Sequence, residues 1–191
     1  MRPLFRSFHL LLLPLLCLLA LTGCAHRPPQ DFAAQYLAAL ERFPASTTAD
    51  LDTAMQHFVD VFTHMTATDI RERVARTYAS DLFFNDTLYT ATQREALADH
   101  LAGTGQAMDA MQVEILGWTA QDGEVYVRWL MHTRFSMAGR DVDARTIGMT
   151  HLRFNDAGQV VLHQDFWDSS QGFLEHVPVL GGMIRWVRSR L

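Results

Sequence analysis

The stretch Gly158-Gln-Val-Val-Leu-His-Gln-Asp-Phe-Trp-Asp168 has the composition of a β-strand that closes a hairpin. It follows a turn signal at residues 155–158, contains no Pro, and is rich in β-branched and aromatic residues. Alternate side chains of a strand point to opposite faces, so His163, Asp165 and Trp167 share one face. The imidazole and the carboxylate are then roughly 6.6–7 Å apart along the strand. This spacing predicts either a polar pair in the wall of a pocket or a buried His–Asp pair with a structural role.

The residues upstream of this stretch also alternate between two faces, with a period of two. This alternation predicts strands at residues 111–120, 124–137 and 143–155, separated by turns at residues 121–123 and 138–140. One face of the second strand is mostly apolar, and we expect helices to pack on it; it carries Val125, Val127, Trp129, Met131, Thr133 and Phe135.

Before the predicted strands, apolar residues recur about every 3.6 positions, as they do along one face of a helix. An apolar stripe over residues 51–65 predicts an amphipathic helix, and Thr68 or Asp69 is a candidate N-cap for a second helix that ends near Tyr78. A short strand at residues 82–86 and a third helix at residues 92–108 follow. Helices before hairpins predict an α+β domain over residues 51–170, with helices on one face of a curved antiparallel sheet.

The N-terminus has the pattern of a secretory leader. Arg2 and Arg6 precede an apolar run over residues 10–21, and Leu21-Thr22-Gly23-Cys24 resembles the lipobox of bacterial lipoproteins. The resemblance implies a signal peptide at residues 1–23, lipidation of Cys24, and a spacer at residues 24–50. Ala25 after the cysteine implies retention at the outer membrane, facing the periplasm. An uncleaved signal anchor is the alternative.

The composition excludes several classes of chemistry. All sixteen strongly basic residues are Arg, so a Schiff-base lysine and a phosphate-binding lysine loop are excluded. The two cysteines lie in the leader and at the lipidation site, so the folded part has no disulfide and no cysteine metal site. Loss of the leader would change the net charge from −5 to −7, which is unsuited to nucleic acid. No cofactor is expected.

The tail at residues 171–191 ends in an apolar segment that carries Arg185, Arg188 and Arg190. A cationic amphipathic helix could lie on an anionic bilayer surface. Packing on the sheet or closure of a pocket mouth is the alternative interpretation.

The sequence resembles the nuclear transport factor 2-like fold in its order of elements and in two segments. The segments are Tyr78-Ala79-Ser80-Asp81-Leu82-Phe83-Phe84-Asn85-Asp86 and residues 152–158, which run into Phe166-Trp167. That superfamily includes the SnoaL-like polyketide cyclases and ketosteroid isomerase. The resemblance covers about residues 51–170 and implies a cone-shaped curved sheet with three N-terminal helices. A homodimer is implied by the resemblance alone.

Within this resemblance, Asp86 falls where ketosteroid isomerase has its general-base carboxylate. The oxyanion-hole positions fall on Phe62 and about Thr150, and a phenyl ring cannot donate a hydrogen bond. Steroid isomerisation is therefore not expected. The concave face implied by the resemblance agrees with the strand alternation, and it carries Trp129, Met131, Thr133, Gly148, Thr150, His163, Asp165 and Trp167.

Three functional hypotheses remain from the sequence. The first is a lipid-anchored protein that binds a small, mostly hydrophobic molecule, with Trp167, Trp129, Met131, Thr133, Gly148 and Thr150 as binding residues. The second is an acid–base enzyme of the isomerase, cyclase or hydrolase type, with Asp165, His163 and Asp86 as catalytic residues. The third is a structural or interaction module of the cell envelope. A metal site through His132, His151 and His163 is not expected, because alternation places His163 on the other face.

Overall fold

The computed structural model describes residues 31–191, so the predicted leader and Cys24 lie outside the described residues. The chain divides into two units, Met1–Gln35 and Tyr36–Leu191. The hydrophobic clusters found among the described residues all lie within the second unit, which therefore has its own core. Between residues 31 and 191, no helix has both the length and the apolar character needed to cross a bilayer.

A six-stranded sheet forms the centre of this unit, in the order β2-β1-β6-β5-β4-β3. Its strands are β1 (Tyr78–Asn85), β2 (Thr90–Gln93), β3 (Ala110–Gln121), β4 (Glu124–Met137), β5 (Arg140–Phe154) and β6 (Val160–Trp167). Neighbouring strands are antiparallel except β1 and β6, which are parallel. No hairpin joins β1 to β6, so a tight turn does not impose the antiparallel direction on this pair.

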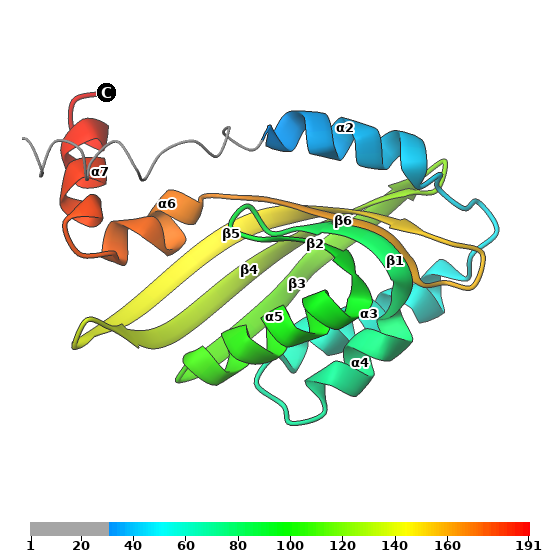
Figure 1. Ribbon diagram of the computed structural model, residues 1–191, viewed down its shortest axis with the longest axis horizontal. Helices are drawn as coiled ribbons and strands as arrows, with labels where there is room; N and C mark the ends of the chain where they lie inside the picture. Colours follow the sequence, from blue (N-terminus) through cyan, green and yellow to red (C-terminus); the bar gives the residue numbers. More distant parts are fainter. Residues whose placement is uncertain (1–30) are drawn as a thin grey trace, which may run out of the picture. The chain divides into compact units, whose positions relative to one another are not determined.

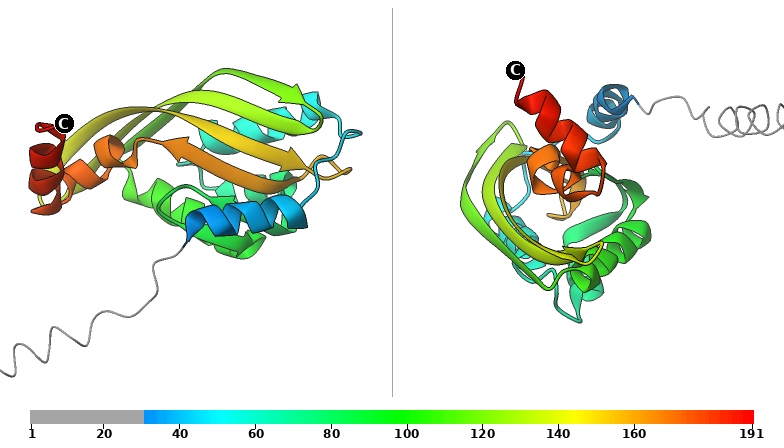
Figure 2. Two further views of the ribbon diagram at one scale, coloured as in Figure 1. Left: turned by 90° about the horizontal axis from the view of Figure 1, so that it is seen from above. Right: turned by 90° about the vertical axis from the view of Figure 1, so that its left-hand side faces the viewer.

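The long strands β3, β4 and β5 curve, and the end-on view shows them bending around the helices (Figure 2). A bulge interrupts the β3–β4 register between Ile115 and Gly117, and Gly117 has a φ of 144°. Bulges increase the local twist and bend of a strand. The curvature gives the sheet a concave face, on which the apolar residues of β4 lie.

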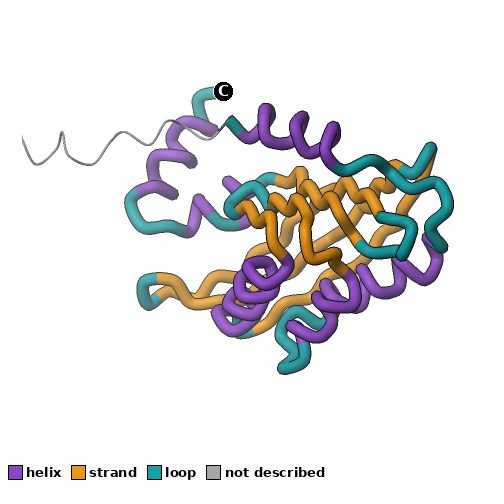
Figure 3. The backbone as a smooth tube through the Cα atoms, turned by 45° about the vertical axis from the view of Figure 1, so that its right-hand side comes forward, coloured by secondary structure: helices purple, strands orange, loops and turns teal. Residues whose placement is uncertain are grey.

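Three helices cover the concave face, α3 (Leu51–Thr63), α4 (Ile70–Thr77) and α5 (Arg94–Ala107), as Figures 1 and 3 show. Asp50 caps α3, because its carboxylate accepts a hydrogen bond from the Thr53 backbone N–H at 3.3 Å. Phe58 and Val61 of α3 belong to the main core together with Val125 and Val127 of β4. The predicted α+β class and helix-covered curved sheet are confirmed.

Several boundaries differ from the predictions, and two of these differences concern β1 and β2. The helix expected over residues 92–108 begins only at Arg94, because Thr90–Gln93 forms the edge strand β2 and pairs with β1. The strand expected at residues 82–86 extends back to Tyr78 through its pairing with β6. Both differences come from strand pairing between distant segments, which overrides local propensity.

Helix α2 (Phe32–Arg42) occupies part of the predicted spacer at residues 24–50, and from Tyr36 onward it packs on the convex face of the sheet. The Tyr36 hydroxyl lies 2.8 Å from His151 Nδ1, and Glu124 Oε2 lies 2.6 Å from His151 Nε2. Arg153 donates to the carbonyls of Leu40 and Phe43 at 2.7 and 2.8 Å. These contacts make the segment from Tyr36 part of the folded domain, so the expected spacer is shorter than predicted.

The C-terminal tail forms α6 (Ser169–Gly172), a 3-10 turn η1 (Leu174–His176) and α7 (Leu180–Arg188). Arg188 of α7 pairs with Asp168 at 3.0 Å and with Glu175 at 2.7 Å. Trp186 and Met183 of the same helix are largely exposed. Of the tail segments, α6 and the adjoining Phe173 contact the cavity described below, whereas α7 does not line it.

Candidate functional site

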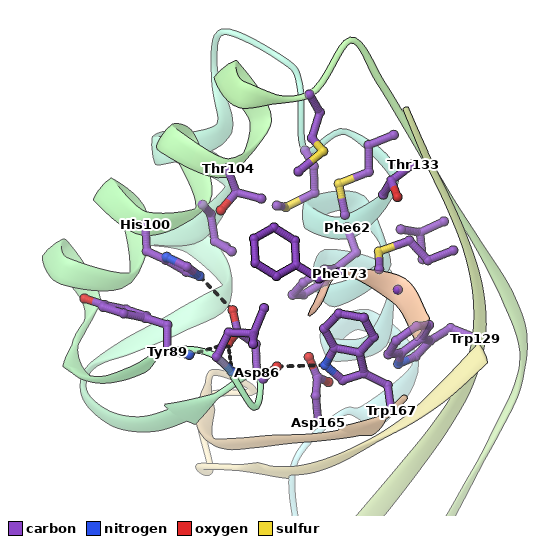
Figure 4. A pocket seen from close by; sticks show the side chains of 18 of the residues that line it. Phe62, Asp86, Tyr89, His100, Thr104, Trp129, Thr133, Asp165, Trp167 and Phe173 are labelled. Carbon is purple, nitrogen blue, oxygen red and sulfur yellow. Dashed lines mark hydrogen bonds and ion pairs between the residues drawn. The ribbon is translucent and has the colours of Figure 1, made fainter. Parts of the chain in front are cut away.

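A cavity of about 810 Å³ lies between the concave face of the sheet and helices α3 and α5, with α6 at one end (Figure 4). Most of its wall is made of aromatic rings, aliphatic side chains and methionines. The apolar lining residues include Phe58, Phe62, Met65, Phe84, Leu101, Met108, Met111, Val113, Ile115, Trp129, Met131, Phe135, Trp167 and Phe173. This size and composition are those of a pocket for a small molecule.

Asp165 of β6 places a carboxylate on the sheet side of this cavity. Its side chain is 13% exposed, and Figure 4 shows the carboxylate directed toward the cavity beside Trp167. The Thr150 hydroxyl of β5 donates to Asp165 Oδ1 at 2.5 Å, and Trp129 Nε1 of β4 donates to the Thr150 hydroxyl at 2.9 Å. Three adjacent strands therefore hold this carboxylate in one orientation.

His163 lies behind Asp165 and is fully buried. Its Nε2 lies 3.0 Å from Asp165 Oδ1, and its Nδ1 lies 2.8 Å from the Tyr78 hydroxyl. The rings of Phe58, Phe62 and Phe84 pack around the imidazole. These rings separate His163 from the cavity, which it does not line.

The Tyr78 contact assigns the tautomer of His163. Burial raises the pKa of Tyr78 well above its ordinary value, and the charge of Asp165 adds to this increase, so the hydroxyl keeps its proton. Among the described residues Nδ1 is the hydrogen-bond partner of this buried hydroxyl, so Tyr78 donates to Nδ1; the imidazole proton then lies on Nε2, which donates it to Asp165. Asp165 Oδ1 then accepts two hydrogen bonds. Among residues 31–191, no group donates to Asp165 Oδ2.

Asp86 and His100 form a second polar pair in the cavity wall. Asp86 Oδ2 lies 2.7 Å from His100 Nε2, while Oδ1 accepts from the backbone N–H groups of Leu88 and Tyr89 at 2.9 and 2.7 Å. Burial raises the pKa of Asp86, but the hydrogen bonds from His100 and the two N–H groups outweigh it, and the pKa lies below its ordinary value. Both oxygens of this carboxylate are occupied, in contrast to Asp165.

The structure brings together most of the residues that the sequence singled out. The cavity is lined by seven of the nine, namely Asp86, Trp129, Met131, Thr133, Thr150, Asp165 and Trp167. His163 and Gly148 do not line it. A Cβ atom on Gly148 would lie 2.3 Å from Trp129 Cζ2, so the glycine makes room for the indole ring. The close approach at Gly148 is therefore made by a side chain of the neighbouring strand β4, and not by a ligand.

His100 is the main cavity residue that sequence reasoning missed. Its position between Leu97 and Leu101 places it toward the apolar side of α5, and its ring stacks on Tyr89 with centroids 4.1 Å apart. A polar residue beside buried leucines at helical spacing was the available signal. Phe173 was also missed, because it follows the last strand and reaches the cavity only through the turn of α6.

The described residues hold no group of three or more His, Cys, Asp or Glu side chains suited to a metal ion. His132 and His151 lie away from the cavity. His132 Nε2 lies 2.6 Å from Asp143. Both ring nitrogens of His151 have hydrogen-bond partners, Tyr36 and Glu124.

A curved antiparallel sheet with helices on its concave face and an apolar cavity between them defines a cone-shaped α+β fold. The model of the SnoaL-like domain family matches residues 55–163, more than half of the chain. The protein belongs to this family. No curated protein sequence matches the chain.

Solved structures of the nuclear transport factor 2-like and SnoaL-like type are similar in fold. A protein from Shewanella denitrificans OS-217, described as a SnoaL-like polyketide cyclase, has a TM-score of 0.55 at 15% identity, over 72% of this chain and 98% of that one. A phenazine biosynthesis-related protein from Pseudomonas aeruginosa has a TM-score of 0.52 at 14% identity, over 63% and 82% of the two chains. A nuclear transport factor 2-like protein of unknown function from Exiguobacterium has a TM-score of 0.52 at 13% identity, over 60% and 98%.

Proposed function

We propose that this protein binds a small, mostly hydrophobic molecule in the cavity between the sheet and α3 and α5. The observation that carries the proposal is a cavity of about 810 Å³ with an apolar wall and a carboxylate, Asp165, whose Oδ2 receives no hydrogen bond from residues 31–191. Burial of an apolar ligand surface supplies the affinity, at about 25 cal/mol per Å². Asp165, held by Thr150 and His163, orients the polar end of the ligand.

The test uses the fragment of residues 31–191, which contains the whole compact unit. The probe is N-phenyl-1-naphthylamine, a neutral apolar dye whose fluorescence increases when it leaves water. We expect saturable binding with one dye per chain. Thr133→Trp should abolish it, because Thr133 lines the cavity and an indole would fill that space.

Arg134→Trp is the matched control, since the next residue of β4 points to the opposite, exposed face. Circular dichroism of both variants verifies that they fold. Dye binding that is not saturable, or that survives Thr133→Trp in a folded protein, would contradict the proposal.

A second candidate function is acid–base catalysis, and the arrangement around Asp165 favours it. A carboxylate with one free oxygen, directed into a cavity and positioned by a hydroxyl and an imidazole, has the geometry of a proton acceptor. In this case Asp165→Asn would remove turnover of a substrate while sparing its affinity. A binding protein would show no turnover in either form.

The lipid anchor is part of the same proposal. Lipidated Cys24 would hold the domain at the outer membrane on the periplasmic side, as the Leu21-Thr22-Gly23-Cys24 sequence supports. Metabolic labelling of the full chain with a palmitate analogue should give a labelled protein, and Cys24→Ser should lose the label. An unlabelled wild-type chain would refute the anchor and leave the cavity proposal intact.

A further inference from the structure

Acidic groups outnumber basic groups among the described residues that line the cavity. Among residues 31–191, the Asp, Glu, His and Arg side chains in its wall are Asp86, Asp99, Asp165 and His100, and none is an Arg. Because the chain contains no Lys, Arg is its only strongly basic residue type. The wall of the described cavity therefore contains three carboxylates and no guanidinium or ammonium group.

Two of these carboxylates have partners that reduce their effect on a ligand. Asp86 is paired with His100 and with two backbone N–H groups. Asp99 lies at the exposed rim, where Arg71 forms a salt bridge with it. Neither presents an unpaired charge to the interior of the cavity.

Asp165 differs, because its neighbours are neutral hydrogen-bond donors. Thr150 is uncharged, and the contact with Tyr78 leaves His163 with a single proton on Nε2. A cationic imidazole would carry a proton on Nδ1 as well, which would leave the buried Tyr78 hydroxyl without an acceptor in the described part of the chain. With His163 neutral, the hydroxyls of Tyr78 and Thr150 and the Nε2–H group of His163 each have an acceptor, and none of the described residues that contact Asp165 is an Arg.

The surroundings of Asp165 Oδ2 increase the importance of this charge. The carboxylate lies near Trp129 and Trp167 in a mostly apolar wall, where charges interact more strongly than in water. Aromatic faces also attract cations. A ligand carboxylate placed beside Asp165 would meet a second carboxylate, and no lining residue of the described chain offers it a guanidinium or ammonium group.

Within residues 31–191, Asp165 Oδ2 has no hydrogen-bond donor and no Arg lines the cavity, and from these two observations we infer that the cavity selects apolar molecules whose polar end is a hydrogen-bond donor without negative charge. A protonated primary amine fits best, a hydroxyl is second, and a carboxylate is rejected. This inference rests on the proposed binding function and adds the chemical class of the ligand to it.

The test is competition against bound N-phenyl-1-naphthylamine by three molecules with the same alkyl chain: decylamine, decan-1-ol and decanoate. At about pH 7.5 the amine is cationic and the acid is anionic. We expect decylamine to bind at least about tenfold more tightly than decanoate, with decan-1-ol between them, because a hydrogen bond to a charged group is worth about that factor.

Asp165→Asn should bring the amine and the carboxylate to within about threefold of each other, since the amide has the same shape without the charge. Asp122→Asn, in the exposed β3–β4 turn, makes the same change of net charge away from the cavity and should preserve the full difference.

Equal displacement by all three molecules, or a preference that survives Asp165→Asn, would overturn the inference while leaving dye binding and the proposed function standing. Failure of the dye itself to bind would instead reject the proposed function.

Discussion

Replacing Gly105 by alanine is expected to lower the free energy of unfolding by about 2 kcal/mol or more. A Cβ atom at this position of α5 would lie 2.1 Å from the carbonyl oxygen of Met65 and 3.0 Å from its carbonyl carbon. Backbone atoms of the loop after α3 cannot rotate away as a side chain can, so α5 must shift. Urea unfolding followed by circular dichroism measures the change.

Gly103 in the same helix provides the matched control. Nothing lies within 4 Å of a Cβ built at Gly103, so Gly103→Ala gains helix propensity without a clash. We expect it to raise the free energy of unfolding by about 0.5–1 kcal/mol. If both variants changed stability equally, close packing of α5 on the Met65 loop would be refuted.

The second large effect is expected for ligand binding. Trp167→Ala should weaken binding of N-phenyl-1-naphthylamine by about thirtyfold, because a central aromatic contact is typically worth 2 kcal/mol or more. The indole forms part of the cavity wall, donates from Nε1 to the Asp86 carbonyl at 2.7 Å, and packs against Gly172 of α6. Fluorescence titration of residues 31–191 measures the dissociation constant.

Two further variants test whether the effect of Trp167→Ala comes from loss of the aromatic wall of the cavity. Trp118→Ala removes an indole from β3 that is 40% exposed and does not line the cavity, so affinity should be unchanged. Trp167→Phe keeps an aromatic wall and loses the N–H group, so its affinity should lie close to wild type. Wild-type affinity of Trp167→Ala would show that this side of the cavity does not contact the probe.

The alternation of residues predicted the cavity wall on the strands. Trp129, Met131 and Thr133 lie at every second position of β4, and all three line the cavity as expected. A strand has only two faces, so one correct assignment of burial orients every residue along it. The same logic placed Asp165 and Trp167 on the inner face of β6.

Depth within the protein could not be predicted in this way. His163 shares a face with Asp165, but Phe58, Phe62 and Phe84 from other elements cover it. Gly148 lies beneath the Trp129 ring, and no pattern within β5 indicates this. His100 meets Asp86 through the packing of α5 against β1, across fourteen positions of the chain.

The sequence by itself determined the α+β class, the faces of the long strands and the absence of lysine chemistry, because these follow from local periodicity and composition. Only the tertiary structure decided that β1 pairs in parallel with β6, that α2 from Tyr36 packs on the sheet, and that Asp165 rather than His163 reaches the cavity. The physical reason is that each of these features depends on contacts between segments distant in the chain, whose free energy is absent from any local pattern.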